Sequence, residues 1–498
     1  MSTVEITVLP VGQGTGTLIQ RFEGVSDKPL STVLVDLGSA LWKPQQTGFE
    51  SAKFVEGQLR KMENPTLNAV FLSHGDVDHT NLITSLLKKF SPPCANKAAT
   101  DTLTVRNVYH GGRHGEYRAK NRSNCLDELD NYRSNGVNSI VSPPFGPSTG
   151  DLVVPIYQDA ATKIYIIAGN VIASTTRVGA NSIFGLKPIK KHYASNTTSL
   201  VLLVALTENP DNQQHFVLTG DTTAFGLAHC NDKLALSPLP PSPVATVTLP
   251  HHGSKATTYD LLGAQSNDPG DLAEENIRAF VARLRPQSLA VSAGEVTPYK
   301  HPAARAIKDF GAFLRLSDFD DSTLRGAGQH FFTSYFQRNE LEVWHKEPDK
   351  WPATAGWKTV QTDMAVYTTD YFKGDPATTE ALVVNPSSGQ VKPPPPPSPP
   401  PYDRETPRCC GWTFQVRDGK CKVLKVLDLK FLSSAGVRRP ESRHGPLLLQ
   451  RFVSLPSAPS GEPPPPTPPS PADIAAAPGR RPPSEPASGR STRLRPLI

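Results

Sequence analysis

The sequence has little of what marks a secreted or membrane protein. No uninterrupted apolar run approaches the roughly 18 residues that a membrane-spanning helix needs. The first residues, MSTVEITVLPVGQG, lack the basic stretch and following apolar stretch of a secretory signal. Only six cysteines occur, without the paired spacing of a structural zinc site, at positions 94, 125, 230, 409, 410 and 421. We therefore expect reduced thiols, no membrane insertion and a cytoplasmic location.

Aromatic residues are scarce where proline is abundant. Of the 50 prolines, 25 lie from Pro393 onward. Such a segment cannot bury enough apolar surface to offset the entropy lost on ordering. We expect one folded domain over residues 1–375, a proline-rich linker over 376–408, a small basic segment of uncertain fold over 409–455 and a disordered tail over 456–498. The run KPPPPPSPPP is typical of polyproline II, which acts as a rigid spacer or binds a protein partner. If it is only a tether, deleting residues 391–498 should leave the activity of the folded domain intact.

The folded part also lacks an excess of positive charge. Residues 401–498 carry 16 basic against 8 acidic residues, a net charge of +8, so the total of +6 leaves −2 for residues 1–400. Global charge therefore gives no argument for a nucleic-acid partner, although the basic tail would add weak, salt-sensitive attraction to a polyanion.

Strand and helix signals alternate along the first part of the chain. β-branched or apolar runs followed by Gly, Asp or Pro predict strands, and apolar residues at helical spacing predict helices. We expect two sheets sandwiched by helices, with strands near 4–11, 17–21, 32–36, 68–72, 102–109, 151–157, 163–168, 199–205, 215–218, 244–249 and 288–292, helices near 49–62, 81–89, 126–134, 272–284 and 303–314, and a small hairpin within 411–432.

One stretch concentrates candidate metal ligands. In FLSHGDVDHTNL, two imidazoles and two carboxylates occupy six residues directly after an apolar run: His74, Asp76, Asp78 and His79. Clustered this tightly on a loop, they repel one another unless a cation holds them, and divalent metals take such N and O donors. The alternative is an Asp-rich cap for the helix that follows, with histidines that only pack or face water.

Two other strand ends carry the same kinds of side chain. Asp221 ends the strand near 215–218, and His251 and His252 follow the strand near 244–249. If these strands are neighbours in one sheet, their loops meet at one edge. Adjacent residues on an extended chain point to opposite sides, so His251 and His252 should not serve the same metal. We favour His252 as the ligand and leave His251 for packing or substrate contact.

Seven blocks in this order resemble the metallo-β-lactamase superfamily, and within it the hydrolase domain of ComEC-type DNA-uptake proteins and their free-standing relatives. They cover about residues 4–315 and are Val11-Gly-Gln-Gly14, Val35-Asp36-Leu-Gly38, Ser73-His-Gly-Asp-Val-Asp-His79, Asn196-Thr-Thr-Ser-Leu-Val-Leu202, Leu218-Thr-Gly-Asp221, Pro250-His-His-Gly-Ser254, and Ala293-Gly-Glu295 with His301-Pro302.

The resemblance implies an α/β fold, the αββα sandwich, with the metal site at the sheet edge. It implies two divalent metal ions, zinc or manganese, with His74 and Asp76 on one, Asp78 and His79 on the other, Asp221 between them and His252 or His251 completing the second. Many members have His where Asp76 stands, and a carboxylate there shifts the site toward harder metals. The lone ligand histidine that the family places between the second and fourth ligand motifs is not evident, since His192 and His215 lack a recognisable setting, a trait that the ComEC-type domains share.

Function follows from the implied ions. A hydroxide held between two metals is a strong nucleophile at neutral pH, which implies hydrolysis. Asp78 or Asp221 would accept the water's proton, and His301 would bind an anionic substrate or protonate the leaving group; alternatively His301 is a surface residue. Asn196, Ser199 and His251 are the candidate substrate contacts.

The ComEC-type relatives favour a phosphodiester substrate, so nucleic acid is one candidate partner and a nuclease one form of the activity. Two alternatives stay open. The first is a hydrolase of a small lactone, thioester or phosphate ester. The second is a catalytically idle fold that acts as a binding protein.

Overall fold

The structure is a computed structural model that describes the chain in segments. These are residues 2–24, 26–39, 46–93, 97–118, 123–133, 140–143, 154–171, 195–207, 213–237, 244–259, 269–293, 302, 304–312, 333–338, 340–346, 355–361, 365–368, 370–371, 408–417 and 420–430. His301, most of the predicted linker and the predicted tail at 456–498 lie outside them.

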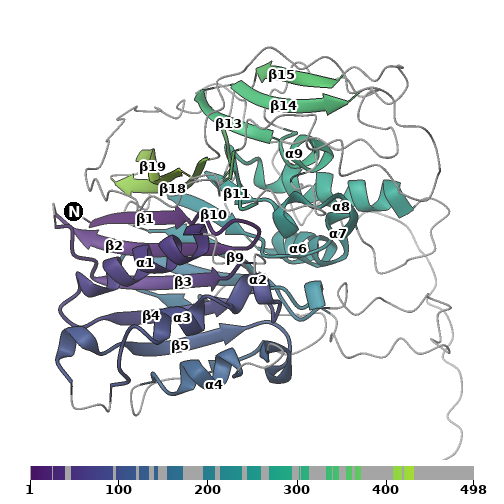
Figure 1. Ribbon diagram of the computed structural model, residues 1–498. Helices are drawn as coiled ribbons and strands as arrows, with labels where there is room; N and C mark the ends of the chain where they lie inside the picture. Colours follow the sequence, from purple (N-terminus) through teal and green to yellow (C-terminus); the bar gives the residue numbers. More distant parts are fainter. Residues whose placement is uncertain are drawn as a thin grey trace, which may run out of the picture. The chain divides into compact units, whose positions relative to one another are not determined.

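The first sheet is built mainly from the N-terminal part of the chain (Figure 1). Its order is β17-β18-β1-β2-β3-β4-β5-β6, with β19 paired to β18. The neighbours from β17 to β3 are antiparallel, and those from β3 to β6 are parallel. The strands are β1 (Ser2–Val8), β2 (Gly16–Glu23), β3 (Ser31–Leu37), β4 (Thr66–Leu72), β5 (Thr104–His110), β6 (Ile140–Val141), β17 (Asp370–Tyr371), β18 (Arg408–Arg417) and β19 (Lys420–Lys430).

The second sheet has the order β16-β12-β11-β10-β9-β8-β7. Its strands are β7 (Tyr157–Gln158), β8 (Thr162–Ala168), β9 (Val201–Leu206), β10 (Gln214–Leu218), β11 (Thr246–Thr248), β12 (Ser288–Val291) and β16 (Ala365–Thr368). Every residue of β9 is buried. Its unbroken apolar run, Val-Leu-Leu-Val-Ala-Leu, is therefore what a strand covered on both faces requires. A separate antiparallel sheet contains β13 (Thr333–Arg338), β14 (Glu340–Lys346) and β15 (Ala355–Gln361).

The two main sheets face each other. Phe216 of β10 and Phe414 of β18 meet edge to face, with ring centroids 5.8 Å apart. The residues beside Phe216 in β10, His215 and Val217, point to the opposite face and are also buried, so the outer face of the second sheet is covered as well.

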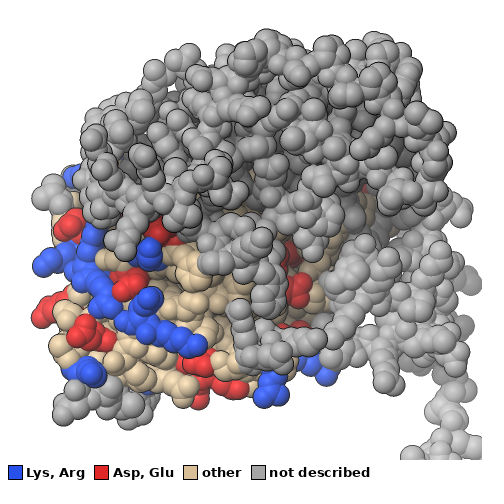
Figure 2. All heavy atoms as spheres, in the orientation of Figure 1, with Lys and Arg blue, Asp and Glu red and all other residues tan. Residues whose placement is uncertain are grey.

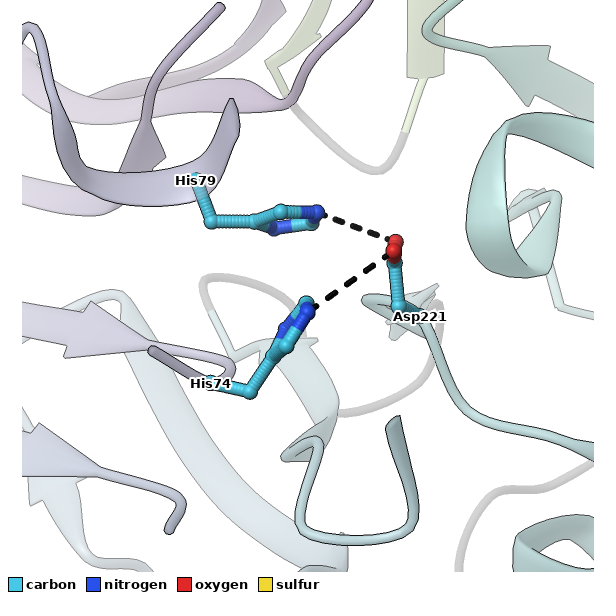
Figure 3. Close-up of side chains that lie close together, drawn as sticks. All are labelled: His74, His79 and Asp221. Carbon is cyan, nitrogen blue, oxygen red and sulfur yellow. Dashed lines mark ion pairs between the residues drawn. The ribbon is translucent and has the colours of Figure 1, made fainter. Parts of the chain in front are cut away.

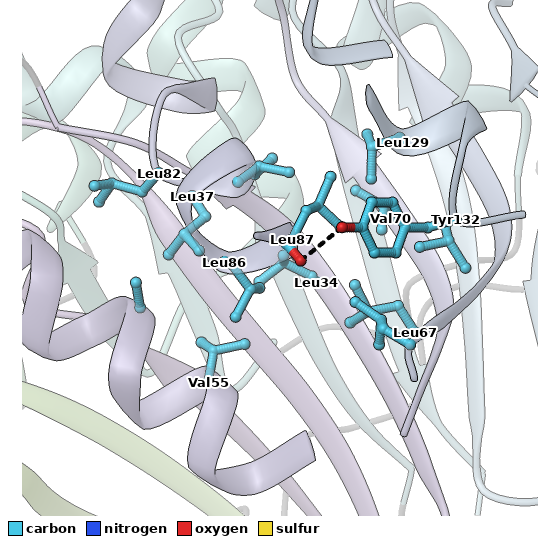
Figure 4. Packing of buried hydrophobic residues seen from close by; sticks show 14 of the residues in the cluster. Leu34, Leu37, Val55, Leu67, Val70, Leu82, Leu86, Leu87, Leu129 and Tyr132 are labelled. Carbon is cyan, nitrogen blue, oxygen red and sulfur yellow. Dashed lines mark hydrogen bonds between the residues drawn. The ribbon is translucent and has the colours of Figure 1, made fainter. Parts of the chain in front are cut away.

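Helices pack on both sheets. On the first sheet, leucines of α3 and the side chain of Val55 in α1 pack against Leu34, Leu67 and other strand residues (Figure 4). Tyr132 anchors this layer by donating a hydrogen bond to the carbonyl of Leu87 at 2.8 Å. The helices are α1 (Gln46–Arg60), α2 (Val77–Thr80), α3 (Ile83–Leu87), α4 (Cys125–Asp130), α6 (Ala224–Leu236), α7 (Lys255–Thr258), α8 (Pro269–Leu284) and α9 (Ala304–Phe310).

The helix α6 lies against β8 and against α8. The described residues thus form the predicted αββα sandwich, and the fold class is confirmed. No described helix combines the length and apolarity that crossing a membrane would need.

Several elements differ from the sequence-based prediction. The helix expected over 81–89 begins earlier, as α2, and contains Asp78 and His79. The helical pattern is interrupted at Leu82, whose backbone N–H donates to the Leu37 carbonyl at 3.1 Å. Beside it, the Asn81 side chain donates to the carbonyl of Ser39 at 2.6 Å and accepts from its N–H at 2.9 Å. The helix α6, capped by the Thr223 side chain, was not predicted at all.

The hairpin of β18 and β19 belongs to the first sheet. Residues Val416 to Trp412 of β18 pair antiparallel with Val4 to Val8 of β1. The hydroxyls of Thr7 and Thr413 are 2.7 Å apart, and Trp412 and Phe414 are buried. The hairpin was predicted, but its membership of the N-terminal sheet was not. Deleting residues 391–498 removes this buried strand. We therefore no longer expect the shortened chain to keep its stability and activity.

Candidate metal centre

The candidate ligands follow the carboxyl ends of strands in both sheets. β4 ends at Leu72, directly before Ser73 and His74. β10 ends at Leu218, three residues before Asp221, and β11 ends at Thr248, just before the 3-10 turn η4 (Pro250–Gly253). Because the two sheets face each other, these ends meet at one place in the molecule.

Two sets of donor atoms converge there. In the first, His74, His79 and Asp221 each place a ligand atom within 4.8 Å of the others. Figure 3 shows both rings directed at the Asp221 carboxylate, with His79 Nε2 3.1 Å and His74 Nε2 3.8 Å from its oxygens. The second set is Asp78, His79 and His252, in which His252 Nε2 lies 3.5 Å from Asp78 Oδ2.

Three atoms of the first set are buried without a hydrogen-bond partner among the described residues: His74 Nε2, His79 Nε2 and Asp221 Oδ1. Leaving buried polar atoms unsatisfied costs free energy, and native proteins seldom do so. Imidazole nitrogens and carboxylate oxygens facing one point are the donors that zinc, manganese and similar ions take. The residues present therefore fit a divalent metal ion.

Burial and mutual charge shape the ionisation of this cluster. Burial alone would raise the pKa of Asp221, but His251, His79 and His252 outweigh it and hold that pKa well below its usual value. Asp78 responds in the same way, since His252 and His79 bring its pKa to about 2. Burial would lower the pKa of His79, yet Asp221 and Asp36 raise it well above the usual value. The carboxylates are thus ionised, and a bound cation would displace protons from imidazole.

Asp36 supports the cluster from behind. It is fully buried at the end of β3 and has a left-handed backbone, with φ of 51°. Its Oδ2 accepts a hydrogen bond from His79 Nδ1 at 2.9 Å. Asp36 belongs to one of the blocks that resemble the superfamily but is not among the predicted site residues; an aspartate near a strand end, two residues before Gly38, was the available signal.

The block Val11–Gly14 closes against the ligand loop by backbone packing. A Cβ on Gly38 would lie 2.4 Å from His79 N, and one on Gly14 would lie 2.2 Å from the Gly38 carbonyl oxygen. Thr15 N donates to the Asp78 carbonyl at 3.0 Å. These glycines are needed because backbone approaches backbone here.

The assumption that His251 and His252 lie on an extended chain is wrong. Both adopt left-handed conformations, with φ of 46° and 55°, in the 3-10 turn. Their rings, with centroids 5.6 Å apart, both reach Asp221. His251 Nδ1 is 2.7 Å from Asp221 Oδ2, and only His252 belongs to a donor set. His252 Nδ1 is held 2.7 Å from the Ser292 carbonyl, so it donates there and leaves Nε2 facing Asp78.

Three other predicted site residues lie around this cluster. Asp76 Oδ2 is 3.4 Å from His74 Nε2, but its side chain is 41% exposed and it joins neither donor set. Ser199 Oγ accepts from the backbone N–H of Asp221 at 2.9 Å and so orients that ligand. Asn196 Nδ2 lies 3.3 Å from His251 Nδ1. His301 lies outside the described residues.

Comparisons with known proteins add little. No family model matches the chain, and no curated protein matches its sequence. Among solved structures, the metallo-β-lactamase MIM-1 from Novosphingobium pentaromativorans is similar over 56% of this chain and 89% of its own, at 12% identity and a TM-score of 0.24. A similarity this weak does not support a function, so the function proposed below is based on the geometry of the cluster.

Proposed function

We propose that this protein is a metal-dependent hydrolase, and that its substrate is a phosphodiester. The observation that carries the hydrolase is the convergence of five buried or half-buried donors in two overlapping sets that share His79, the first of which holds three buried atoms with no hydrogen-bond partner among the described residues. The donors are His74, Asp78, His79, Asp221 and His252. We propose these as ligands, with Asp76 as a further carboxylate at the edge, and two ions as the number bound.

A divalent ion held by these residues would activate water and stabilise negative charge on the attacked centre. The chain's own groups then divide the remaining work. The ionised carboxylate of Asp78 is 24% exposed, against 2% for Asp221, and we therefore propose Asp78 as the group that accepts a proton from water. Of the four histidine rings, His251 is the most exposed, at 21%, and with Asn196 beside it we propose it as a substrate contact.

The carboxylates of the centre affect which metal ion it would bind. Asp76, Asp78 and Asp221 make the centre rich in oxygen donors, which suits manganese as well as zinc.

The preference for a phosphodiester rests on the resemblance to ComEC-type hydrolase domains. The described surface adds no basic footprint on the face in Figure 2, where blue and red side chains intermingle. Among the described residues, Lys53 pairs with Glu50 and Arg60 with Glu56. Recognition would therefore depend on the metal centre.

The test uses the purified full chain, metal analysis and a substrate panel. The panel contains single- and double-stranded DNA, RNA, cyclic nucleotides, a lactone and a thioester, each with manganese and with zinc. We expect turnover of a phosphodiester that falls at least about a hundredfold in Asp221→Ala and His79→Ala, because metal ions contribute several kcal/mol to such reactions. His229→Ala is the matched control, since His229 lies on α6 with its ring against Phe225.

The other outcomes separate the alternatives. Turnover of only the lactone or thioester would replace the phosphodiester with a small ester. Absence of bound metal and of any turnover with either ion would leave a binding protein and refute the hydrolase.

A further inference from the structure

Ser73 lies at the junction of the two sheets, one residue before the first ligand. It is 2% exposed, and its backbone and side chain are fully engaged. Its N–H donates to Asp36 Oδ1 at 2.7 Å, and its carbonyl accepts from Leu200 N at 3.0 Å. Its hydroxyl lies 2.6 Å from Asp36 Oδ2 and 3.1 Å from the Nδ1 atoms of both His74 and His79. One hydroxyl therefore touches two of the proposed ligands.

The protons of this group can be assigned from the chemistry of its partners. A hydroxyl has one proton to donate, and an ionised carboxylate can only accept. The short contact to Asp36 therefore takes the Ser73 proton, which leaves Ser73 Oγ as an acceptor. His74 Nδ1 faces that oxygen and must carry a proton to bond with it. His79 Nδ1 lies between the same oxygen and Asp36 Oδ2, and both of these are acceptors.

We propose that Ser73 is a positioning residue of the metal centre, whose hydroxyl fixes the tautomer and orientation of His74 and contributes to those of His79. With Nδ1 protonated on both rings, any proton that a metal displaces is the one on Nε2, and each Nε2 lone pair is then directed toward Asp221. A partner on the far ring nitrogen is how proteins commonly orient histidine ligands. Here a single hydroxyl contacts both rings. It also links Asp36 to His74, since the described residues show no direct contact between these two side chains. The effect on metal binding rests on the proposed function, whereas the hydrogen bonds of Ser73 do not.

The surroundings restrict which side chain fits this position. A Cβ on Gly220 would lie 2.8 Å from Ser73 Cβ, so the second sheet leaves no room on that side. On another side, Ser73 lines a cavity of about 20 Å³ with Thr15, Thr17 and Thr248. Ser73→Ala removes only the hydroxyl and should fold, whereas Ser73→Thr keeps the hydroxyl and has this cavity beside it for the added methyl group.

The experiment compares three variants of the full chain: Ser73→Ala, Ser73→Thr and Thr246→Val. Thr246 is a matched control, because its buried hydroxyl bonds Ser288 Oγ at 2.8 Å in the second sheet, away from the ligand rings. Zn²⁺ affinity is measured by competition with a chromophoric chelator, the geometry from the absorption spectrum of the Co²⁺-loaded protein, and stability from thermal unfolding of the metal-free protein.

We expect Ser73→Ala to bind Zn²⁺ about 10- to 100-fold more weakly, as partners of metal ligands typically do when removed, and to change the Co²⁺ spectrum. Ser73→Thr should recover most of the affinity. Thr246→Val should lower the unfolding temperature and leave the affinity unchanged. Wild-type affinity in Ser73→Ala, or an equal loss in Thr246→Val, would overturn the proposal.

A second measurement does not depend on metal binding. Histidine nitrogen NMR of the metal-free protein, at a pH alkaline enough to make both rings neutral, should show His74 protonated at Nδ1 in the wild type but not predominantly so in Ser73→Ala. Protonation at Nε2 in the wild type would refute the role of Ser73, even if the protein binds metal. Failure of the wild type to bind metal would instead refute the proposed function and leave this result standing.

Discussion

Replacing Phe414 by alanine tests whether residues beyond the proline-rich segment belong to the folded core. Phe414 is 1% exposed and packs edge to face on Phe216 between the two sheets. Truncating a fully buried phenylalanine to alanine costs about 3–5 kcal/mol, because transfer free energy is lost and a cavity remains. That is a large part of the 5–15 kcal/mol or so by which domains are stable.

The assay is equilibrium unfolding in urea, followed by far-ultraviolet circular dichroism. Phe414→Ala should lower the midpoint while leaving the denaturant slope unchanged. Leu236→Ala is the control, because Leu236 is an apolar residue that is 77% exposed and its truncation should change stability by less than about 0.5 kcal/mol.

Two truncations extend the same test. Removing residues 431–498 leaves every described strand in place, so we expect wild-type unfolding and metal binding. Removing residues 376–498 takes away β18 and exposes the edge of β1, which invites aggregation, so we expect insoluble or strongly destabilised protein. Wild-type stability in both Phe414→Ala and the longer truncation would refute the docking of this hairpin on β1.

Three further predictions concern the metal, a backbone contact and pH. Chelation should lower the unfolding temperature of the metal-loaded protein, since an ion at 100 times its Kd contributes about 2.7 kcal/mol; a shift that persists in Asp221→Ala would contradict the assigned site. Gly38→Ala should abolish metal binding because its Cβ would lie 2.4 Å from His79 N, whereas Gly57→Ala, where nothing lies within 4 Å, should not; calorimetric titration decides. Burial lowers the pKa of His215 to about 4, so the unfolded chain takes up this proton first as pH falls below about 6.5. The free energy of unfolding of the wild type should then fall by about 3 kcal/mol between pH 6.5 and 4, relative to that of His215→Leu measured by the same urea titrations. The same pH profile in both proteins would refute this prediction.

The ligand types were visible in the sequence because metal chemistry restricts them to a few residues placed after strands. FLSHGDVDHTNL, Asp221 and the pair His251-His252 all follow apolar runs, and strand ends are where side chains converge. The alternation and length of those runs likewise determined the two-sheet sandwich. Local sequence therefore determined which residues are candidates and which layer architecture carries them.

Which candidates meet was decided by tertiary structure. His79 belongs to both donor sets and Asp76 to neither, although the two are only three residues apart, because α2 rotates His79 inward. The left-handed turn at His251 and His252 brings both rings to Asp221, which no pattern of adjacent residues on an extended strand predicts.

The pairing of β18 with β1 could not be predicted from the sequence either, because the alternation of a strand shows which residues face the core but does not identify the neighbouring strand. Its pairing with β1 joins residues about 400 positions apart, and only the complementary surface that β1 and Phe216 present together selects it. The hydroxyl of Ser73 is the same case at the scale of one atom. Its type is local, while its role depends on Asp36, His74 and His79 being brought around it by two strands and a helix.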